Sequence, residues 1–330
     1  MNTQKNHTLE LIKLFAAYMV VFIHVSFYGE LGVVVDGLSR FAVPFFFLVS
    51  GYYSYRINAE KIKKRIVKIL TLFIFSAICC AAFEIIVLLK YNTAELSIIL
   101  NKFAELCTYV NLFVFNLPVI SGHLWYLLAI LYVYVIFYFV TKFHIKERVI
   151  FIVSLFLLVA HIVLGEGLSL FGITLPIPYV RNFALMGIPF FSLGLFVKKY
   201  ENRFKKLPNY MVFAFSLIGV VETVFSRCFF GSNEFFIGSL FILIALVCVF
   251  IKCADIKYPA FLTSLEGCST YIYVFHLIIT KALLIIYGMV GIDIYSSVTL
   301  ENLHPIVVCV AATVFAYVVN KALKFKKLKK

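Results

Sequence analysis

The sequence predicts an all-α fold, a polytopic membrane helical bundle of about ten transmembrane helices with both termini in the cytoplasm. Hydrophobic residues make up 63% of the 330 residues, and the mean hydropathy is +1.01. Apolar runs long enough to cross a bilayer recur along the chain, and charged residues lie between them. The net charge of +14 lies in short loops rather than in a basic domain with interleaved aromatic residues, so we expect no nucleic-acid partner.

Ten apolar runs have the length of a membrane span, since each can cross a hydrocarbon core of about 30 Å. They lie at about 9–28, 40–56, 66–89, 123–141, 149–165, 179–197, 210–228, 236–252, 269–288 and 304–323. The run 40–56 is short and contains Pro44, so we expect it to be kinked or partly interfacial. The first run lacks a small-residue cleavage site, so we expect a retained span rather than a signal peptide.

The distribution of basic residues predicts the orientation of the chain. One set of loops holds 23 of the 30 Lys and Arg residues, and the opposite set holds five. Cytoplasmic loops carry such an excess, so both termini are expected in the cytoplasm. We find no soluble domain and no internal repeat, so residues 1–330 are expected to form a single membrane domain. Its semi-polar connection 90–122 could form short helices over the outer mouth.

Two polar side chains, Lys13 and His24, lie eleven positions apart within the first apolar run. On an α-helix this spacing is about three turns, so both side chains point along nearly the same face, roughly 16 Å apart in height. A lipid-facing Lys or His costs free energy, so the pair is expected to face a protein interior or a watered cavity. The plainer alternatives are a helix-packing histidine at His24 and a snorkelling anchor at Lys13.

The segment after the second span is dense in positive charge, with Arg56 followed by KIKKRIVKI. If the segment is helical, the spacing i, i+3, i+4, i+7 places four cations on one face: Lys61, Lys64, Arg65 and Lys68. One interpretation is anchoring to anionic lipid on the cytoplasmic side. The other is a phosphate-binding rim for a polyanionic cytosolic ligand. Spacing alone favours anchoring.

Histidine and tryptophan side chains also occur at later span ends. His123 and the only tryptophan, Trp125, stand at the outer end of the fourth span, where an interfacial Trp and an exposed His are both ordinary. His276 lies within the ninth span, and we expect it to have a partner in the bundle.

Charged groups on the outer side could assist His24. Glu30 and Asp36 follow the first span, and Arg40 begins the second. A carboxylate could orient His24 as a base, but we prefer a solvated acidic loop. The eight cysteines show no CxxC pair and lie mostly in apolar runs, so we expect no metal site.

Several motifs, in the right order along the chain, resemble the acyltransferase-3 family of integral membrane O-acyltransferases. They are KLFAAYMVVFIH (13–24), RFAVPFFFLVSGYYSYR (40–56), KKRIVKIL (63–70), HLWYLLAIL (123–131), RNFALMGIPFFSLGLFVKK (181–199) and STYIYVFHLII (269–279). The family usually has Arg where Lys13 stands, so the charge is kept and the bidentate fork is lost. The proline that usually follows the basic segment is also absent, since Thr71 and Leu72 stand there.

The resemblance implies an enzyme of the bacterial plasma (inner) membrane with a ten-helix bundle. It would move an acyl group, commonly acetyl, from cytosolic acyl-CoA to a hydroxyl of a cell-surface sugar, glycopolymer or small acceptor. His24 would be catalytic. The donor would be bound by Lys13, Arg56, Lys64, Arg65 and Lys68, and the supporting residues would be Glu30, Asp36, Arg40, His123, Trp125, Arg181 and His276.

Alternatives remain open at this point. His24 could act as a general base or form a transient acyl-histidine. The chain could instead be a transporter or flippase-like permease for a small polar solute or a lipid-linked sugar, or an idle scaffold. A transporter would be expected to show repeat symmetry with broken helices in equivalent positions, and the sequence shows no such pairing.

Overall fold

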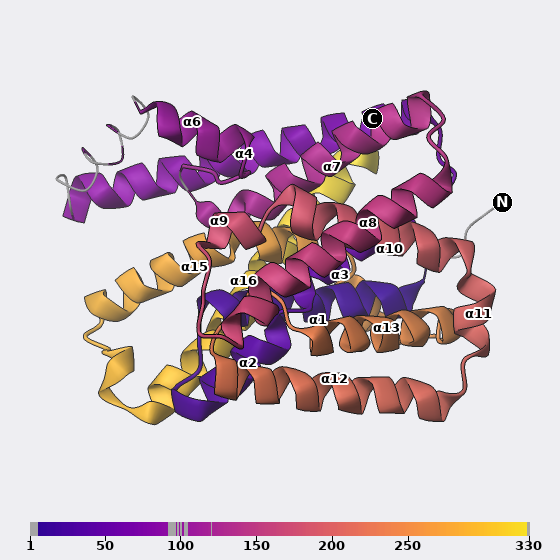
Figure 1. Cartoon of the computed structure of the whole chain (residues 1–330). Helices are drawn as coiled ribbons and strands as arrows, with labels where there is room; N and C mark the ends of the chain where they lie inside the picture. The colour runs from indigo at the N-terminus through magenta and orange to yellow at the C-terminus, as the bar shows by residue number, and fades with distance from the viewer. Residues whose placement is uncertain are drawn as a thin grey trace. The chain divides into compact units, whose positions relative to one another are not determined.

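A computed structural model of the chain describes residues 6–91, 97, 99, 101, 105–119 and 121–328, and side chains as far as Leu323. Every regular element in this part of the chain is a helix, which confirms the predicted all-α fold (Figure 1). The chain forms two compact units, and the division falls within one helix. The first unit comprises Met1–Phe46 with Tyr200–Lys330, and the second comprises Phe47–Lys199.

The first unit contains the N-terminal and C-terminal helices. Its elements are α1 (His7–His24), α2 (Gly29–Ser39), the start of α3 (Ala42–Tyr52), α11 (Glu201–Lys206), α12 (Asn209–Phe230), α13 (Ile237–Lys252), α14 (Ala260–Ser264), α15 (Ser269–Met289), the 3₁₀ helix η4 (Ile294–Ser296) and α16 (Val298–Leu328). The antiparallel helices α12 and α13 lie side by side (Figure 1).

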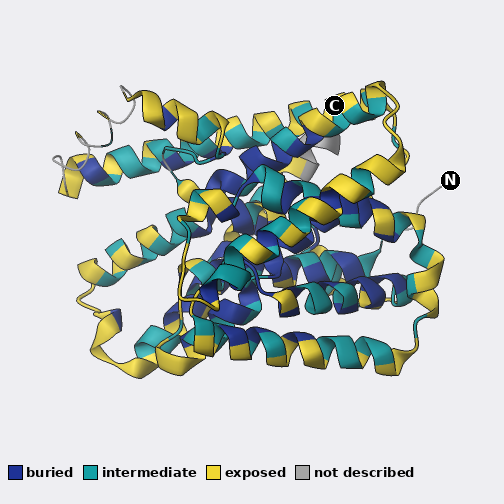
Figure 2. Ribbon diagram, viewed as in Figure 1, coloured by how far each residue is buried: buried dark blue, intermediate teal, exposed yellow. Residues whose placement is uncertain are grey.

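The core of the first unit lies where α1, α15 and α16 meet. On α1 the buried face has helical spacing, with Leu14, Ala17 and Val21 pointing into one cluster. The facing surface of α16 presents small residues, among them Ala312 and Ala316, both fully buried. Small side chains allow membrane helices to approach closely, so this packing holds α1 firmly against its neighbours (Figure 2).

A sharp turn separates α1 from α2. Gly29 adopts φ +60°, a conformation that L side chains rarely adopt, and a Cβ at Gly32 would overlap the Phe27 carbonyl. The turn therefore needs both glycines and ends α1 at His24. Our expectation of a loop at residues 29–39 was wrong, because these residues form α2 before the chain turns again at Arg40.

The second unit holds the middle of the chain. Its elements are the rest of α3, α4 (Ala59–Tyr91), α6 (Leu106–Phe113), the 3₁₀ helix η1 (Gly122–Leu124), α7 (Trp125–Lys142), α8 (Glu147–Ile162), the π-helix η2 (Val163–Gly167), α9 (Ile177–Val180), the π-helix η3 (Phe183–Gly187) and α10 (Ile188–Lys199). In the connection 90–122, α6 is one short helix, while residues 92–96, 98, 100, 102–104 and 120 lie outside the described residues.

Glycines allow a close helix contact in the second unit. A Cβ at Gly51 of α3 would overlap the Phe191 carbonyl of α10, and one at Gly194 of α10 would overlap the Leu48 carbonyl of α3. The two backbones are therefore nearly in contact, as in other membrane helix pairs with small residues at the interface. The contact fixes the end of α3, where Tyr52 begins the turn into α4.

Nine helical segments in the described part of the chain are long and apolar enough to cross a membrane. They are His7–His24, Gly29–Tyr52, Ala59–Tyr91, Gly122–Lys142, Glu147–Gly167, Ile177–Lys199, Asn209–Phe230, Ser269–Met289 and Val298–Leu323. The predicted span 236–252 corresponds to α13, an apolar helix of only 16 residues, about 24 Å long. The predicted run 40–56 is part of a longer segment that begins at Gly29 and is broken at Arg40 and Phe41.

Candidate functional site

The candidate catalytic histidine, His24, is the last residue of α1 and lies directly before the turn into α2. Its side chain is exposed, and its ring packs against that of His276 on α15, with 5.2 Å between ring centroids and 37° between planes. Two histidines remote in sequence therefore meet within the first unit. Both residues were candidates in the sequence analysis, but nothing in the sequence predicts that their side chains are in contact.

The surroundings of His276 fix the orientation of its ring. The side chain is completely buried, and Nδ1 donates a hydrogen bond to the Tyr273 carbonyl oxygen at 2.7 Å. A neutral His276 therefore carries its proton on Nδ1 and presents Nε2 as an acceptor. This bond lies within α15 itself, and the partner on another helix that we expected for His276 is the His24 ring, which thereby has a rigid neighbour.

Lys13 lies on α1 about three turns before His24, as predicted. Its Nζ donates to Glu10 Oε1 at 2.8 Å, and both side chains are largely buried, with 22% and 15% exposure. The pair has the i, i+3 spacing that brings side chains together on a helix. Part of the positive charge of Lys13 is therefore balanced locally by an acid that the sequence interpretation left out.

The acidic residues after α1 do not form a solvated loop, so that expectation was wrong for Asp36. This carboxylate is only 9% exposed and accepts hydrogen bonds from Arg40 Nη2 at 2.6 Å and Arg227 Nε at 2.8 Å. Arg40 also pairs with Glu234 at 3.4 Å. Two guanidinium groups occupy Asp36, so it ties α2 to α12 instead of orienting His24. Glu30 is exposed in the first turn of α2, where an acid favours the positive helix end.

Arg65 is held by its own unit rather than directed to solvent. Its Nη1 donates to Ser54 Oγ at 2.7 Å and Tyr134 Oη at 3.1 Å, and its Nη2 donates to the Tyr53 carbonyl at 2.8 Å. Ser54 is fully buried. The guanidinium therefore joins the end of α3 to α4 and α7, which makes Arg65 a structural cross-link and a poor candidate for a freely available phosphate ligand.

The other cations of the basic segment have the exposure that ligand binding requires. Residues 61–68 lie in α4, which confirms the helix on which the shared face depends. Lys61, Lys64 and Lys68 are exposed, and the structure gives Lys64 and Lys68 no ion pair among the described residues. Their surroundings suit either interpretation, a lipid contact or a phosphate rim.

Trp125 and Arg181 meet at the start of α7, next to His123 in the chain, and the expected exposure of His123 was wrong. His123 is 4% exposed and Trp125 is 5% exposed. The Arg181 guanidinium lies over the Trp125 ring, 5.2 Å from its centroid, in a cation–π contact. These side chains connect the start of α7 with the chain before η3.

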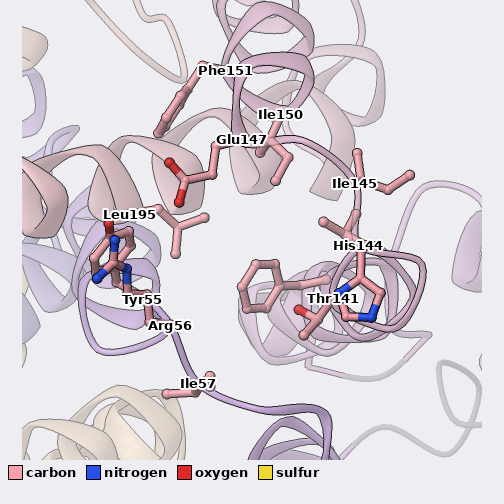
Figure 3. Close-up of a pocket in the computed structure, with 12 residues that line it drawn as sticks. Tyr55, Arg56, Ile57, Thr141, His144, Ile145, Glu147, Ile150, Phe151 and Leu195 are labelled. Carbon is pink, nitrogen blue, oxygen red and sulfur yellow. The ribbon is translucent and has the colours of Figure 1, made fainter.

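Arg56 lines a pocket in the second unit, about 290 Å³ in volume. The pocket lies between the α3–α4 turn, the α7–α8 turn and α10, as Figure 3 shows. The sequence singled out Arg56 because it precedes a basic run, but His144 and Glu147 on the same pocket escaped notice. Their only signal was the short polar turn KFHIKE, which periodicity does not connect with Arg56.

Metal ligands do not converge in the described part of the chain. No group of three or more His, Cys, Asp or Glu side chains there is arranged to hold a metal ion. The paired rings of His24 and His276 have no acidic or thiol side chain completing such a group among the described residues.

Comparison with known proteins identifies one family. The acyltransferase-3 family model, described as an acyltransferase domain, matches residues 6–321. Neither the curated proteins nor the solved structures gave a match. The family match covers nearly the whole chain, including the histidine pair and the basic helix. The chain therefore belongs to the acyltransferase-3 family and is a multi-pass membrane acyltransferase.

Proposed function

We propose that this protein is an O-acyltransferase of a bacterial inner membrane, acting as a single membrane domain with both termini in the cytoplasm. It takes an acyl group, acetyl in the simplest case, from cytosolic acyl-CoA. It transfers that group to a hydroxyl of an extracytoplasmic cell-surface sugar or glycopolymer. The observation that carries the proposal is the exposed His24 ring packed against buried His276, in a chain of an acyltransferase family.

His24 is the catalytic residue in this proposal. As the acceptor hydroxyl attacks the thioester carbonyl carbon, the imidazole takes the hydroxyl proton. The new C–O bond forms, the C–S bond breaks, and the departing thiolate recovers the proton as free CoA thiol. A covalent route would place the acyl group on His24 before the acceptor takes it. Both routes need an exposed, neutral imidazole, and both yield one ester and one CoA thiol.

His276 acts in this proposal as a positioning residue. Its ring is fixed by burial and by the Tyr273 carbonyl, so it limits the rotation of the His24 side chain that packs on it. A fixed orientation matters because a catalytic base must lie within hydrogen-bond reach of the proton that it removes.

The donor side of the proposal rests on cations. Acyl-CoA carries phosphates that cannot enter hydrocarbon, so a basic binding surface on the cytoplasmic side is required. Lys64 and Lys68 are exposed on α4 and suited to that role. Arg65 supports them by holding α4 in place.

The proposal is tested with purified protein in lipid nanodiscs and acyl-CoA labelled in the acyl group. We expect saturable CoA binding and slow release of CoA thiol, accelerated when an acceptor glycan is added. A permease or scaffold would show neither binding nor thiol release, and that result would overturn the enzyme assignment. Mass spectrometry of surface glycans from cells with and without the protein then identifies the acceptor and the acyl group.

A further inference from the structure

The pocket beside Arg56 is the cavity whose chemistry the catalytic proposal leaves unused. It is built entirely from the second unit, and Figure 3 shows Tyr55 and Arg56 on one side with Thr141 and His144 on the other. Phe137, Ile150 and Leu195 also line the pocket and give it apolar surface. The pocket thus combines an apolar lining with hydrogen-bonding groups on two sides, as small-molecule sites commonly do.

The backbone at both polar ends has an uncommon conformation. Arg56 has φ 55° and His144 has φ 51°, and neither is a glycine. Left-handed backbone is strained at such residues and tends to occur at ligand clamps and active sites. The two turns that carry this strain close the same pocket from opposite sides.

Arg56 has no acidic partner among the described residues, and its guanidinium lies over the neighbouring Tyr55 ring, 5.1 Å from the centroid. This distinguishes it from Arg65, whose donors are taken up by Ser54, Tyr53 and Tyr134. The one acid on the pocket wall, Glu147, is paired with Lys199 at 2.5 Å. An anion that entered the pocket would therefore meet a positive group that is not already neutralised.

We propose that this pocket binds the phosphate-bearing part of an amphiphile. The phosphate contacts the Arg56 guanidinium, whose planar fork suits two phosphate oxygens. The apolar part of the ligand lies on Phe137, Ile150 and Leu195, and His144 and Thr141 hydrogen-bond its far end. Two amphiphiles carry this chemistry on the predicted cytoplasmic side, an anionic phospholipid and the CoA donor. Only the CoA alternative rests on the proposed function.

Equilibrium binding to the full chain distinguishes the two sources. Phosphatidylglycerol and phosphatidylcholine are titrated separately onto detergent-purified protein and followed by native mass spectrometry, and CoA is titrated by calorimetry. The variants Arg56→Asn and His144→Asn remove the guanidinium and the imidazole and keep a residue that tolerates left-handed backbone. Thr141→Phe fills the space instead, and Arg148→Gln removes an exposed arginine that does not line the pocket.

Loss of one charge-assisted contact should raise the Kd of the true ligand about tenfold. If the pocket variants raise the Kd of phosphatidylglycerol alone, the pocket is a lipid site. If they raise the Kd of CoA alone, the pocket binds the donor. The Kd of phosphatidylcholine should be the same for all variants, and Arg148→Gln should bind every ligand with the wild-type Kd. If phosphatidylglycerol and CoA bind Arg56→Asn and Thr141→Phe within twofold of wild type, at unchanged Tm, the proposal is overturned. Because the readout is binding, a failure of catalysis would not imitate this result.

Discussion

In both compact units, a charged side chain enclosed by its hydrogen-bond partners contrasts with a polar side chain that is exposed. In the first unit, Asp36 is closed off by Arg40 and Arg227, while His24 is exposed beside a fixed ring. In the second, Arg65 is locked into the helix packing, while Arg56 has no acidic partner among the described residues. Each unit therefore has a charged side chain that supports the helix packing, Asp36 or Arg65, and a polar side chain that is exposed, His24 or Arg56. The charge of a residue and its position in the sequence do not show which of these roles it has. Its hydrogen-bond partners in the structure show it.

The largest expected effect on activity comes from removing the exposed His24 imidazole of the first unit. His24→Ala should lower kcat for acyl transfer by about 10²–10⁴-fold, because general-base assistance is typically worth that much. CoA affinity should not change and Tm should change little, since the His24 side chain is exposed and its ring packs on one face of a His276 ring that is held by its own hydrogen bond. Steady-state kinetics with a calorimetric Kd for CoA measure both quantities. Full turnover by a correctly inserted variant would remove His24 from the mechanism.

Removing the Arg65 guanidinium of the second unit should lower the stability of the fold more than the rate of acyl transfer. Arg65→Ala removes three donated hydrogen bonds, which should lower the free energy of unfolding by roughly 2–4 kcal/mol. The adjacent exposed residue gives a matched control, so Lys64→Ala should leave Tm nearly unchanged. Thermal unfolding in one detergent compares the two. Equal Tm values would show that the Arg65 contacts contribute little.

A smaller effect is expected from the neighbour of His24. His276→Phe keeps an aromatic ring but loses the bond to Tyr273, so kcat should fall about tenfold with KM unchanged. His276→Asn retains a side-chain donor and should recover part of the rate. Separate measurement of kcat and KM tests this role, because a positioning residue should change kcat and leave KM unchanged. A fall in Tm that accounts for the whole loss of activity would mean that His276 is only a packing residue.

The smallest effect should come from the exposed lysines of α4. Lys64→Gln with Lys68→Gln should raise the apparent KM for acyl-CoA about threefold at low salt, and the difference should shrink at high salt. The reason is that exposed charges attract a polyanion through screened electrostatics. An unchanged KM would assign these residues to contact with anionic lipid.

Much of the fold could be predicted because hydrophobic length is a local property. The apolar runs, the helix that begins near Lys61 and the all-α class all follow from consecutive residues. The helix α2 was missed because Gly29 to Ser39 contains two acids and three glycines, a composition typical of loops. Its helix is held by the buried ionic contacts of Asp36, which depend on α12.

The candidate site was predictable as a set of residues and not as an arrangement. His24 and His276 were both singled out, but their contact depends on how α1 and α15 cross. Arg65 and Arg56 looked equivalent within one basic segment, and the hydrogen bonds of Arg65 to Ser54, Tyr53 and Tyr134 distinguish them. The Arg56 pocket was hidden for the same reason, because its walls come from three separate turns and helices.

The most direct test measures ester-linked acyl groups on surface glycans by mass spectrometry. Three strains are compared: one without the protein, one with the wild-type chain and one with His24→Ala at equal membrane abundance. We predict that only the wild-type chain adds the ester and that the variant matches the strain without the protein. A variant that adds the ester at the wild-type level would contradict the assignment of His24 as the catalytic residue.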